Sequence, residues 1–153
     1  MSERLRLFLK LWLLAGVLDG AYASGLTLVR GNGDVGGLWR GVAAGPFGDA
    51  AQHWGTGGAL LGVATHLAIM ATMVAGGLWL ALRTPFGQIA PWKAGLFFGL
   101  ALYCLMYGLV LPLRFGVPFP NPDRVKLALG LLPHVLFVGW PIFAAVRKTA
   151  PTS

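Results

Sequence analysis

Four long apolar runs, separated by connections rich in glycine, proline or charged residues, set the pattern of the chain. They cover about residues 5–28, 56–82, 92–113 and 122–146. Each run is long enough for a helix that crosses the hydrocarbon core of a bilayer, which needs roughly 20 residues. The pattern predicts an all-α fold, an integral membrane four-helix bundle in a single membrane domain of residues 1–153. Because the second and third connections are short, successive helices are expected to be antiparallel neighbours, up-down-up-down.

Local signals mark the starts of three of these helices. Asp49, followed three residues later by Gln52, fits a capping box ahead of the second helix. Pro91 fits the first turn of the third helix, where the missing N–H would have no intrahelical partner. Asn121 fits a cap for the fourth helix, with Pro122 at its first helical position. These starts are therefore predicted from short stretches of sequence alone.

The longest connection, residues 29–55, is expected to be an outer loop. Its glycine-rich first part indicates irregular backbone. A short interfacial helix is predicted over residues 38–44, with Trp39 and Arg40 at the level of the lipid headgroups. A Gly-Pro pair follows directly and is expected to end that helix.

The first apolar run has two interpretations. Basic residues, an apolar stretch and Ala21-Tyr22-Ala23 together fit a secretory signal peptide that would be cleaved after residue 23. The alternative is a retained membrane helix, which is favoured because the apolar character continues past Gly25. Gly16, Gly20 and Ser24 then fall four residues apart and form a small-residue stripe suited to close helix packing.

The composition supports a membrane protein. Hydrophobic residues make up 56% and charged residues 11% of the chain, and the mean hydropathy is +0.70. A soluble domain carries roughly 25% charged residues. A single cysteine, Cys104, excludes an internal disulfide and a cysteine-rich metal site. The net charge of +7 does not predict nucleic-acid binding, because the basic residues lie mostly at the ends of the apolar runs and form no basic face.

The basic residues also predict the orientation in the membrane. An N-in/C-in arrangement leaves five basic residues outside, and the excess of Lys and Arg on the cytoplasmic side agrees with the positive-inside rule. The seven expected inside are Arg4, Arg6, Lys10, Arg83, Lys93, Arg147 and Lys148.

Two of the apolar runs contain the pattern Gly-x-x-x-His, ending at His66 and at His134. At 1.5 Å per residue, counted from the expected helix ends, the strongest polar groups of all four runs lie at a similar depth. An ionised Asp at a helix centre costs roughly 2.5–3.5 kcal/mol on insertion scales, so this layer is expected to face inward and to be mutually paired. The candidates for a ligand or proton site are Asp19, His66, Tyr103, Tyr107 and His134.

Three classes of function remain open. Asp, His and Tyr at one depth suit proton or small-ion handling, for which a homodimer or larger membrane complex is expected. Alternatively, His66 and His134 would ligate one b-type haem in an electron carrier, with Gly62 and Gly130 leaving space for the macrocycle. The third class is a structural or accessory membrane subunit, in which the histidines hold helices together by hydrogen bonds. No catalytic motif is present, so the sequence does not predict an enzyme.

Four further segments carry a family likeness. They are LDGAYA at residues 18–23, GVAAG at 41–45, ALLGVATH at 59–66 and LPHVLFVGWP at 132–141. Together they resemble a family of small uncharacterised four-helix bacterial inner-membrane proteins. The resemblance implies a multi-pass protein of the cell inner membrane, and it implies no activity.

Overall fold

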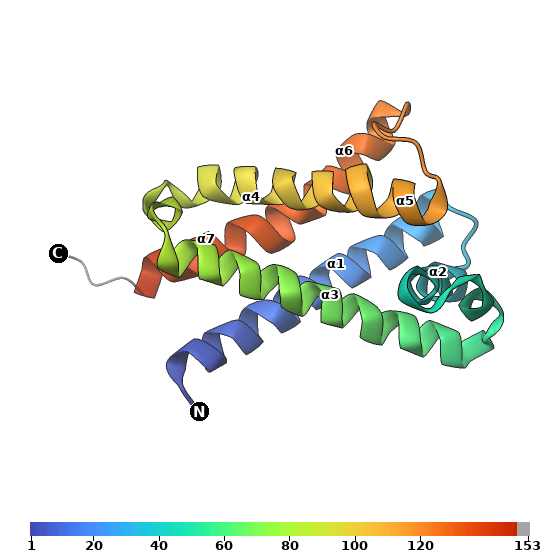
Figure 1. The fold of residues 1–153 in the computed structure, drawn as a ribbon, viewed down its shortest axis with the longest axis horizontal. Helices are drawn as coiled ribbons and strands as arrows, with labels where there is room; N and C mark the ends of the chain where they lie inside the picture. Colours follow the sequence, from blue (N-terminus) through green and yellow to red (C-terminus); the bar gives the residue numbers. More distant parts are fainter. Residues whose placement is uncertain (150–153) are drawn as a thin grey trace. The chain divides into compact units, whose positions relative to one another are not determined.

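The computed structural model describes residues 1–149 of the chain (Figure 1). Over that range the regular secondary structure is entirely helical, so the predicted all-α class is confirmed. Four of the helical stretches are long and apolar enough to cross a membrane. They are α1 (Glu3–Arg30), α3 (Gly55–Arg83), a composite helix over Pro91–Phe115 and a second composite helix over Arg124–Arg147.

The faces of these helices suit a lipid environment. Large apolar side chains are exposed along all four, among them Leu13, Leu60, Leu109 and Leu136. In water such a surface would be an aggregation hazard, whereas lipid tails are as apolar as leucine. The chain is therefore a multi-pass membrane protein by the length and hydropathy of its helices.

Both composite helices contain a π-helical turn. The first consists of α4 (Pro91–Leu105), the π-helix η3 (Met106–Val110) and α5 (Leu111–Phe115). The second consists of α6 (Arg124–Pro133), the π-helix η4 (His134–Gly139) and α7 (Trp140–Thr149).

Prolines lie beside these turns. Pro112 lies inside α5, and Pro133 directly precedes η4. A proline has no N–H to donate within a helix, and π-turns of this kind occur frequently at functional sites.

The helix starts correct two of the local predictions. Asp49 opens a short 3-10 helix, η1 (Asp49–His53), so it does not cap α3. The cap of α6 is Asp123, whose carboxylate accepts hydrogen bonds from the N–H groups of Val125 and Lys126. Asn121 instead accepts from the N–H of Asp123 through its side-chain oxygen, at 2.9 Å. The start of α6 is thus capped by a side-chain oxygen as predicted, but the cap is Asp123 and not Asn121.

The chain forms two compact units. Unit 1 comprises residues 1–11 and the chain from Met73 onward, and unit 2 comprises Trp12–Thr72. Helices α1 and α3 each contribute to both units.

In unit 2, α2 (Val35–Phe47) and η1 pack on the beginning of α3. The carboxylate of Asp34 caps α2 by accepting from the N–H of Gly37 at 2.7 Å. Ala43, Ala44 and Ala51 are fully buried and form a small core with Leu61 beside it. The close approach depends on Gly62, because a Cβ there would overlap the main-chain carbonyl oxygen of Trp39.

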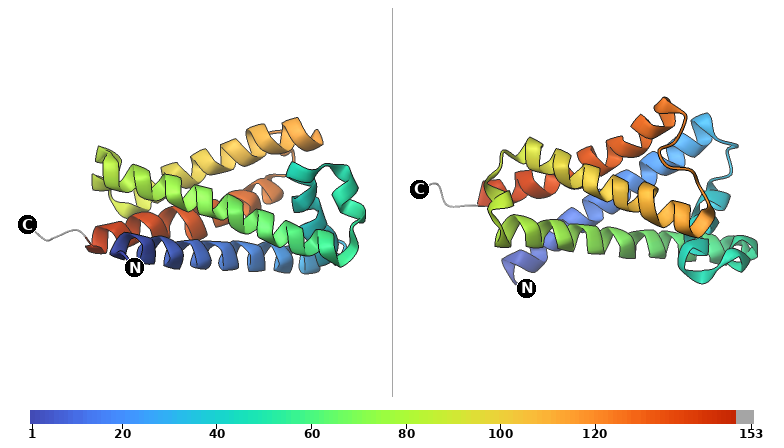
Figure 2. Two further views of the ribbon diagram at one scale, coloured as in Figure 1. Left: turned by 60° about the horizontal axis from the view of Figure 1, so that its bottom comes forward. Right: turned by 45° about the horizontal axis from the view of Figure 1, so that its top comes forward.

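In unit 1, α4 runs beside η4 and α7 (Figure 2). Their backbones approach through glycines: a Cβ on Gly95 would lie 2.6 Å from the backbone nitrogen of Trp140. A Cβ on Gly99 would lie 2.7 Å from the carbonyl oxygen of His134. Phe143 packs edge-on against Phe98 and against Phe86 in η2 (Pro85–Gln88). Small residues at the contact are the usual means by which membrane helices pack closely.

Candidate functional site

The five residues predicted as a site fall into two groups, one in each unit. Asp19 and His66 belong to unit 2, whereas Tyr103, Tyr107 and His134 belong to unit 1. His66, Tyr103 and His134 are buried, but Asp19 and Tyr107 are partly exposed. The structure therefore gives no evidence for one buried layer of all five, and each group is described by itself.

In unit 2, His66 connects α3 to α1 through its ring nitrogens. Its Nε2 lies 3.0 Å from the carbonyl oxygen of Gly16. A carbonyl oxygen only accepts hydrogen bonds, so Nε2 carries a hydrogen and donates it. This hydrogen bond joins the imidazole of α3 to the backbone of α1.

The other ring nitrogen of His66 faces Asp19. Nδ1 lies 3.9 Å from Oδ2 of Asp19, and both side chains are mostly buried. With Nε2 already protonated, a neutral imidazole would present the lone pair of Nδ1 to the carboxylate. That arrangement is repulsive if the carboxylate is ionised. One further proton, held on Nδ1 or on Asp19, makes it attractive.

Trp39 completes this group from α2. Its ring lies 5.3 Å from the imidazole of His66 in an edge-to-face arrangement, with an interplanar angle of 66°. A Cβ on Gly20 would lie 3.2 Å from the indole and 3.5 Å from Nε2 of His66. The sequence predicted Trp39 at the level of the lipid headgroups and did not predict its contact with His66. The sequence signal for this contact is the glycines that let α2 approach α3.

In unit 1, the two tyrosines and His134 form an aromatic cluster. Tyr103 and Tyr107 are stacked with ring centroids 4.6 Å apart. His134 meets both rings edge-on, with centroids 5.9 Å away in each case. Gly130 makes room for the stack, because a Cβ there would lie 3.1 Å from the ring of Tyr103.

The two Gly-x-x-x-His segments differ in how the histidine is held. Nδ1 of His134 lies 2.8 Å from the carbonyl oxygen of Gly130, one turn earlier in the same helix. His66 instead donates across to Gly16 on another helix. The sequence similarity therefore does not correspond to one shared hydrogen-bond geometry.

Tyr103 is unusual among the buried polar groups. Its side chain is 3% exposed, and its hydroxyl has no hydrogen-bond partner among the described residues. A buried hydroxyl left without a partner costs about 1–3 kcal/mol, which makes Tyr103 a measurable feature of the fold.

The residues that the structure describes contain no group of three or more His, Cys, Asp or Glu side chains suited to a metal ion. The haem alternative stays a prediction. For His66 it would require Nε2 to exchange the carbonyl of Gly16 for iron.

Comparison with known proteins adds no relative: no family model, curated protein or solved structure matches the chain. The fold and the two polar groups define the class, a small multi-pass membrane protein with histidines buried in its membrane helices.

Proposed function

We propose that this protein handles protons within the membrane, with Asp19 and His66 as the proton-holding pair. The carrying observation is the way in which His66 is held. Its Nε2 is committed as a donor to Gly16, while Nδ1 faces the carboxylate of Asp19 at 3.9 Å. The pair is attractive with one shared proton and repulsive without it, so the site is suited to take up and release a single proton.

The location of the pair supports the same function. Both residues lie within helices that are long enough to span a membrane. Ionisable side chains in such segments are rare, face the protein interior and commonly mark proton or ion pathways. A small monovalent cation is the competing cargo, because a carboxylate binds either.

The proposal includes an assembly and a location. Four helices make a small carrier, so a homodimer or a larger membrane complex is expected. The distribution of Lys and Arg supports an N-in/C-in orientation. The sequence resemblance supports placement in the bacterial inner membrane.

Proton flux into proteoliposomes under an imposed pH gradient tests the function. His66→Gln keeps a donor near Gly16 but cannot be protonated, and Asp19→Asn removes the carboxylate. Each is expected to lower the flux at least about 10²-fold, the lower end of the range of about 10²–10⁴ typical for removal of a proton-transfer group. His53→Gln and Asp49→Asn are matched controls at exposed side chains of η1 and should leave the flux unchanged.

Two results would contradict the proposal. One is a wild-type protein that carries neither protons nor Na⁺ or K⁺. The other is a flux that survives both His66→Gln and Asp19→Asn in protein of normal thermal stability. If these variants lose only stability, His66 is a structural contact and the protein belongs with the structural or accessory membrane subunits.

A further inference from the structure

Helix α2 places one aromatic side chain directly on His66. The indole of Trp39 lies edge-to-face on His66 at 5.3 Å. Its main-chain carbonyl is in contact with Gly62, one turn before His66 on α3. Helix α2 is therefore fixed against α3 by a backbone contact at the same residue that covers the imidazole.

Little space lies between Gly20, Trp39 and His66. Even a methyl group at Gly20 would already touch both the indole and the imidazole, at 3.2 and 3.5 Å. The carbonyl of Gly16 is taken by Nε2. A metal cation is held by several oxygen ligands or by its own waters, which need room. A proton needs none.

We propose that Trp39 holds the imidazole of His66 in place and restricts this site to the proton. The inference rests on the proposed proton-handling function and names its cargo. Aromatic rings prefer edge-to-face contacts such as this one, so the indole fixes the orientation of the imidazole. Trp39 is thus a positioning residue for the proton on His66.

Other titratable groups near His66 are few on the elements packed against it. Asp19 faces it from α1, with Tyr22 one turn farther along the same helix. On α2, the guanidinium of Arg40 is ion-paired with Asp34 at 3.2 Å. A pH response of Trp39 is therefore assigned to the Asp19–His66 pair by substituting those two residues.

Tryptophan fluorescence tests the contact independently of transport. A protonated imidazole quenches a neighbouring indole, and the difference between wild type and Trp39→Phe isolates the emission of Trp39. That emission should fall as the pH is lowered, and the fall should disappear in His66→Gln but persist in His53→Gln. A pH response that persists in His66→Gln would overturn the role of Trp39.

Ion selectivity tests the cargo. Wild type and Trp39→Phe should carry protons but not Na⁺. Trp39→Leu removes the ring that covers His66 and should admit Na⁺. Wild-type Na⁺ flux, or a Trp39→Leu protein with unchanged selectivity, would refute the inference. Absence of any wild-type flux would instead refute the proposed function, while the fluorescence result would still stand.

A second inference rests on a different surface, in unit 1, and is independent of proton handling. Three exposed basic side chains surround η2: Arg83 ends α3, Lys93 lies in the first turn of α4, and Arg147 lies near the end of α7. We call these three the basic collar. The guanidinium of Arg147 donates to the carbonyl oxygen of Gln88 at 3.2 Å, which holds it against η2.

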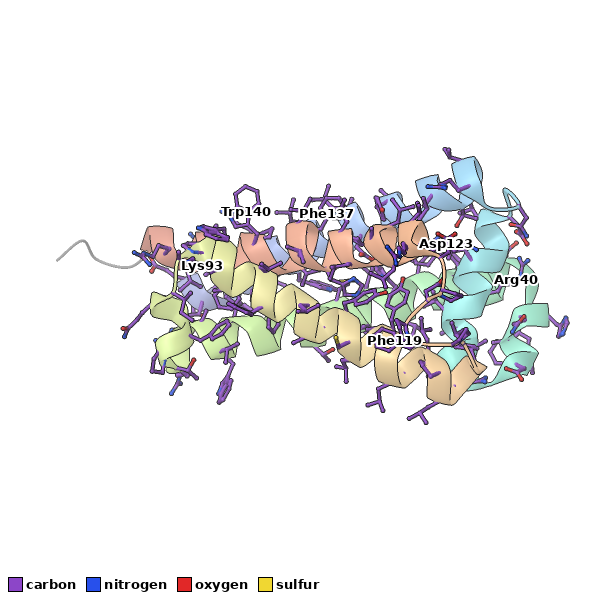
Figure 3. The ribbon with its side chains drawn as sticks, turned by 90° about the horizontal axis from the view of Figure 1, so that it is seen from above. Arg40, Lys93, Phe119, Asp123, Phe137 and Trp140 are labelled. Carbon is purple, nitrogen blue, oxygen red and sulfur yellow. The ribbon has the colours of Figure 1, made fainter. Side chains whose placement is uncertain are left out.

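The surroundings of the basic collar point to a lipid headgroup. The only acidic residue between 73 and 149 is Asp123, which caps α6. Exposed tryptophans accompany the collar at Trp79, Trp92 and Trp140, and Figure 3 shows Trp140 projecting outward from the ribbon. Tryptophan is enriched where membrane meets water. We infer that the basic collar binds the headgroup of an anionic phospholipid.

Lipid binding can be measured in nanodiscs of phosphatidylcholine with and without phosphatidylglycerol. The anionic lipid should be enriched on wild type and raise its melting temperature. Each basic residue contributes up to roughly fivefold in affinity, so Arg83→Gln/Lys93→Gln/Arg147→Gln should abolish most of the enrichment. Arg114→Gln/Arg124→Gln/Lys126→Gln removes the same charge elsewhere and should retain it.

Three results would overturn the lipid site. They are equal loss in both triple variants, no preference for phosphatidylglycerol in wild type, and equal stabilisation by inorganic phosphate in phosphatidylcholine discs.

Discussion

Substituting Gly62 by alanine tests the packing of α2 against α3. A Cβ at this position would overlap the carbonyl oxygen of Trp39 and lie 3.1 Å from its Cα. The obstacle is backbone, which cannot rotate away as a side chain does, so α2 must shift as a whole. Overpacking of this kind costs about 1–3 kcal/mol. The gain in helix propensity is at most about 1 kcal/mol, so a net destabilisation of about 1–2 kcal/mol is expected.

Gly76 supplies the matched control on the same helix. A Cβ there meets nothing within 4 Å, so Gly76→Ala brings only the propensity gain and should be neutral or stabilising by up to about 1 kcal/mol. Unfolding in detergent, followed by circular dichroism, compares the two variants. A Gly62→Ala protein as stable as Gly76→Ala would refute the close contact between α2 and α3.

The same substitution has a functional consequence. A shift of α2 moves Trp39 off His66, so Gly62→Ala should lose the pH response of Trp39 fluorescence, as His66→Gln does. Gly76→Ala should keep that response. Gly62→Ala is therefore expected to lose both stability and the fluorescence response. Gly76→Ala is expected to lose neither.

The remaining predictions concern single groups. Tyr103→Phe removes a buried hydroxyl without a partner among the described residues, so it should stabilise the protein by about 1–3 kcal/mol in the same unfolding assay; a loss of stability would mean that the hydroxyl holds a ligand or water. Asp123→Ala removes the cap of α6 and should cost about 0.5–2 kcal/mol, whereas Asp123→Asn should cost little. Protein purified from haem-replete cells should show no Soret band, because Nε2 of His66 is committed to Gly16; a strong band lost in His66→Ala would restore the haem alternative. Mass spectrometry of the mature N-terminus should find Asp19 retained, and cleavage after Ala23 would remove the proposed site.

Local chemistry decided part of the helix boundaries. Pro91 begins α4 as expected, because a proline fits the first turn wherever the helix lies. The predicted cap of α6 was Asn121, whereas the observed cap is Asp123. Both side chains are good acceptors, and the backbone conformation determines which of them caps the helix. The π-helical turns were not predicted from their prolines, because a missing donor allows a kink, an end or a π-turn, and packing selects among these.

The sequence by itself determined that this is an all-α protein with four helices able to span a membrane. Length and hydropathy are sums over neighbouring residues, so no tertiary contact is needed to read them. It also predicted that His66 and His134 are buried, because an ionisable side chain inside a long apolar run faces the protein interior and not lipid.

Only the tertiary structure decided what those histidines touch. Nε2 of His66 reaches Gly16, fifty residues away, and Trp39 covers the ring from a third helix. Such contacts depend on how closely the backbones approach, which is set by glycines whose partners lie elsewhere in the chain. A periodic pattern shows which face of a helix carries small residues. It does not show which carbonyl or aromatic ring packs against that face.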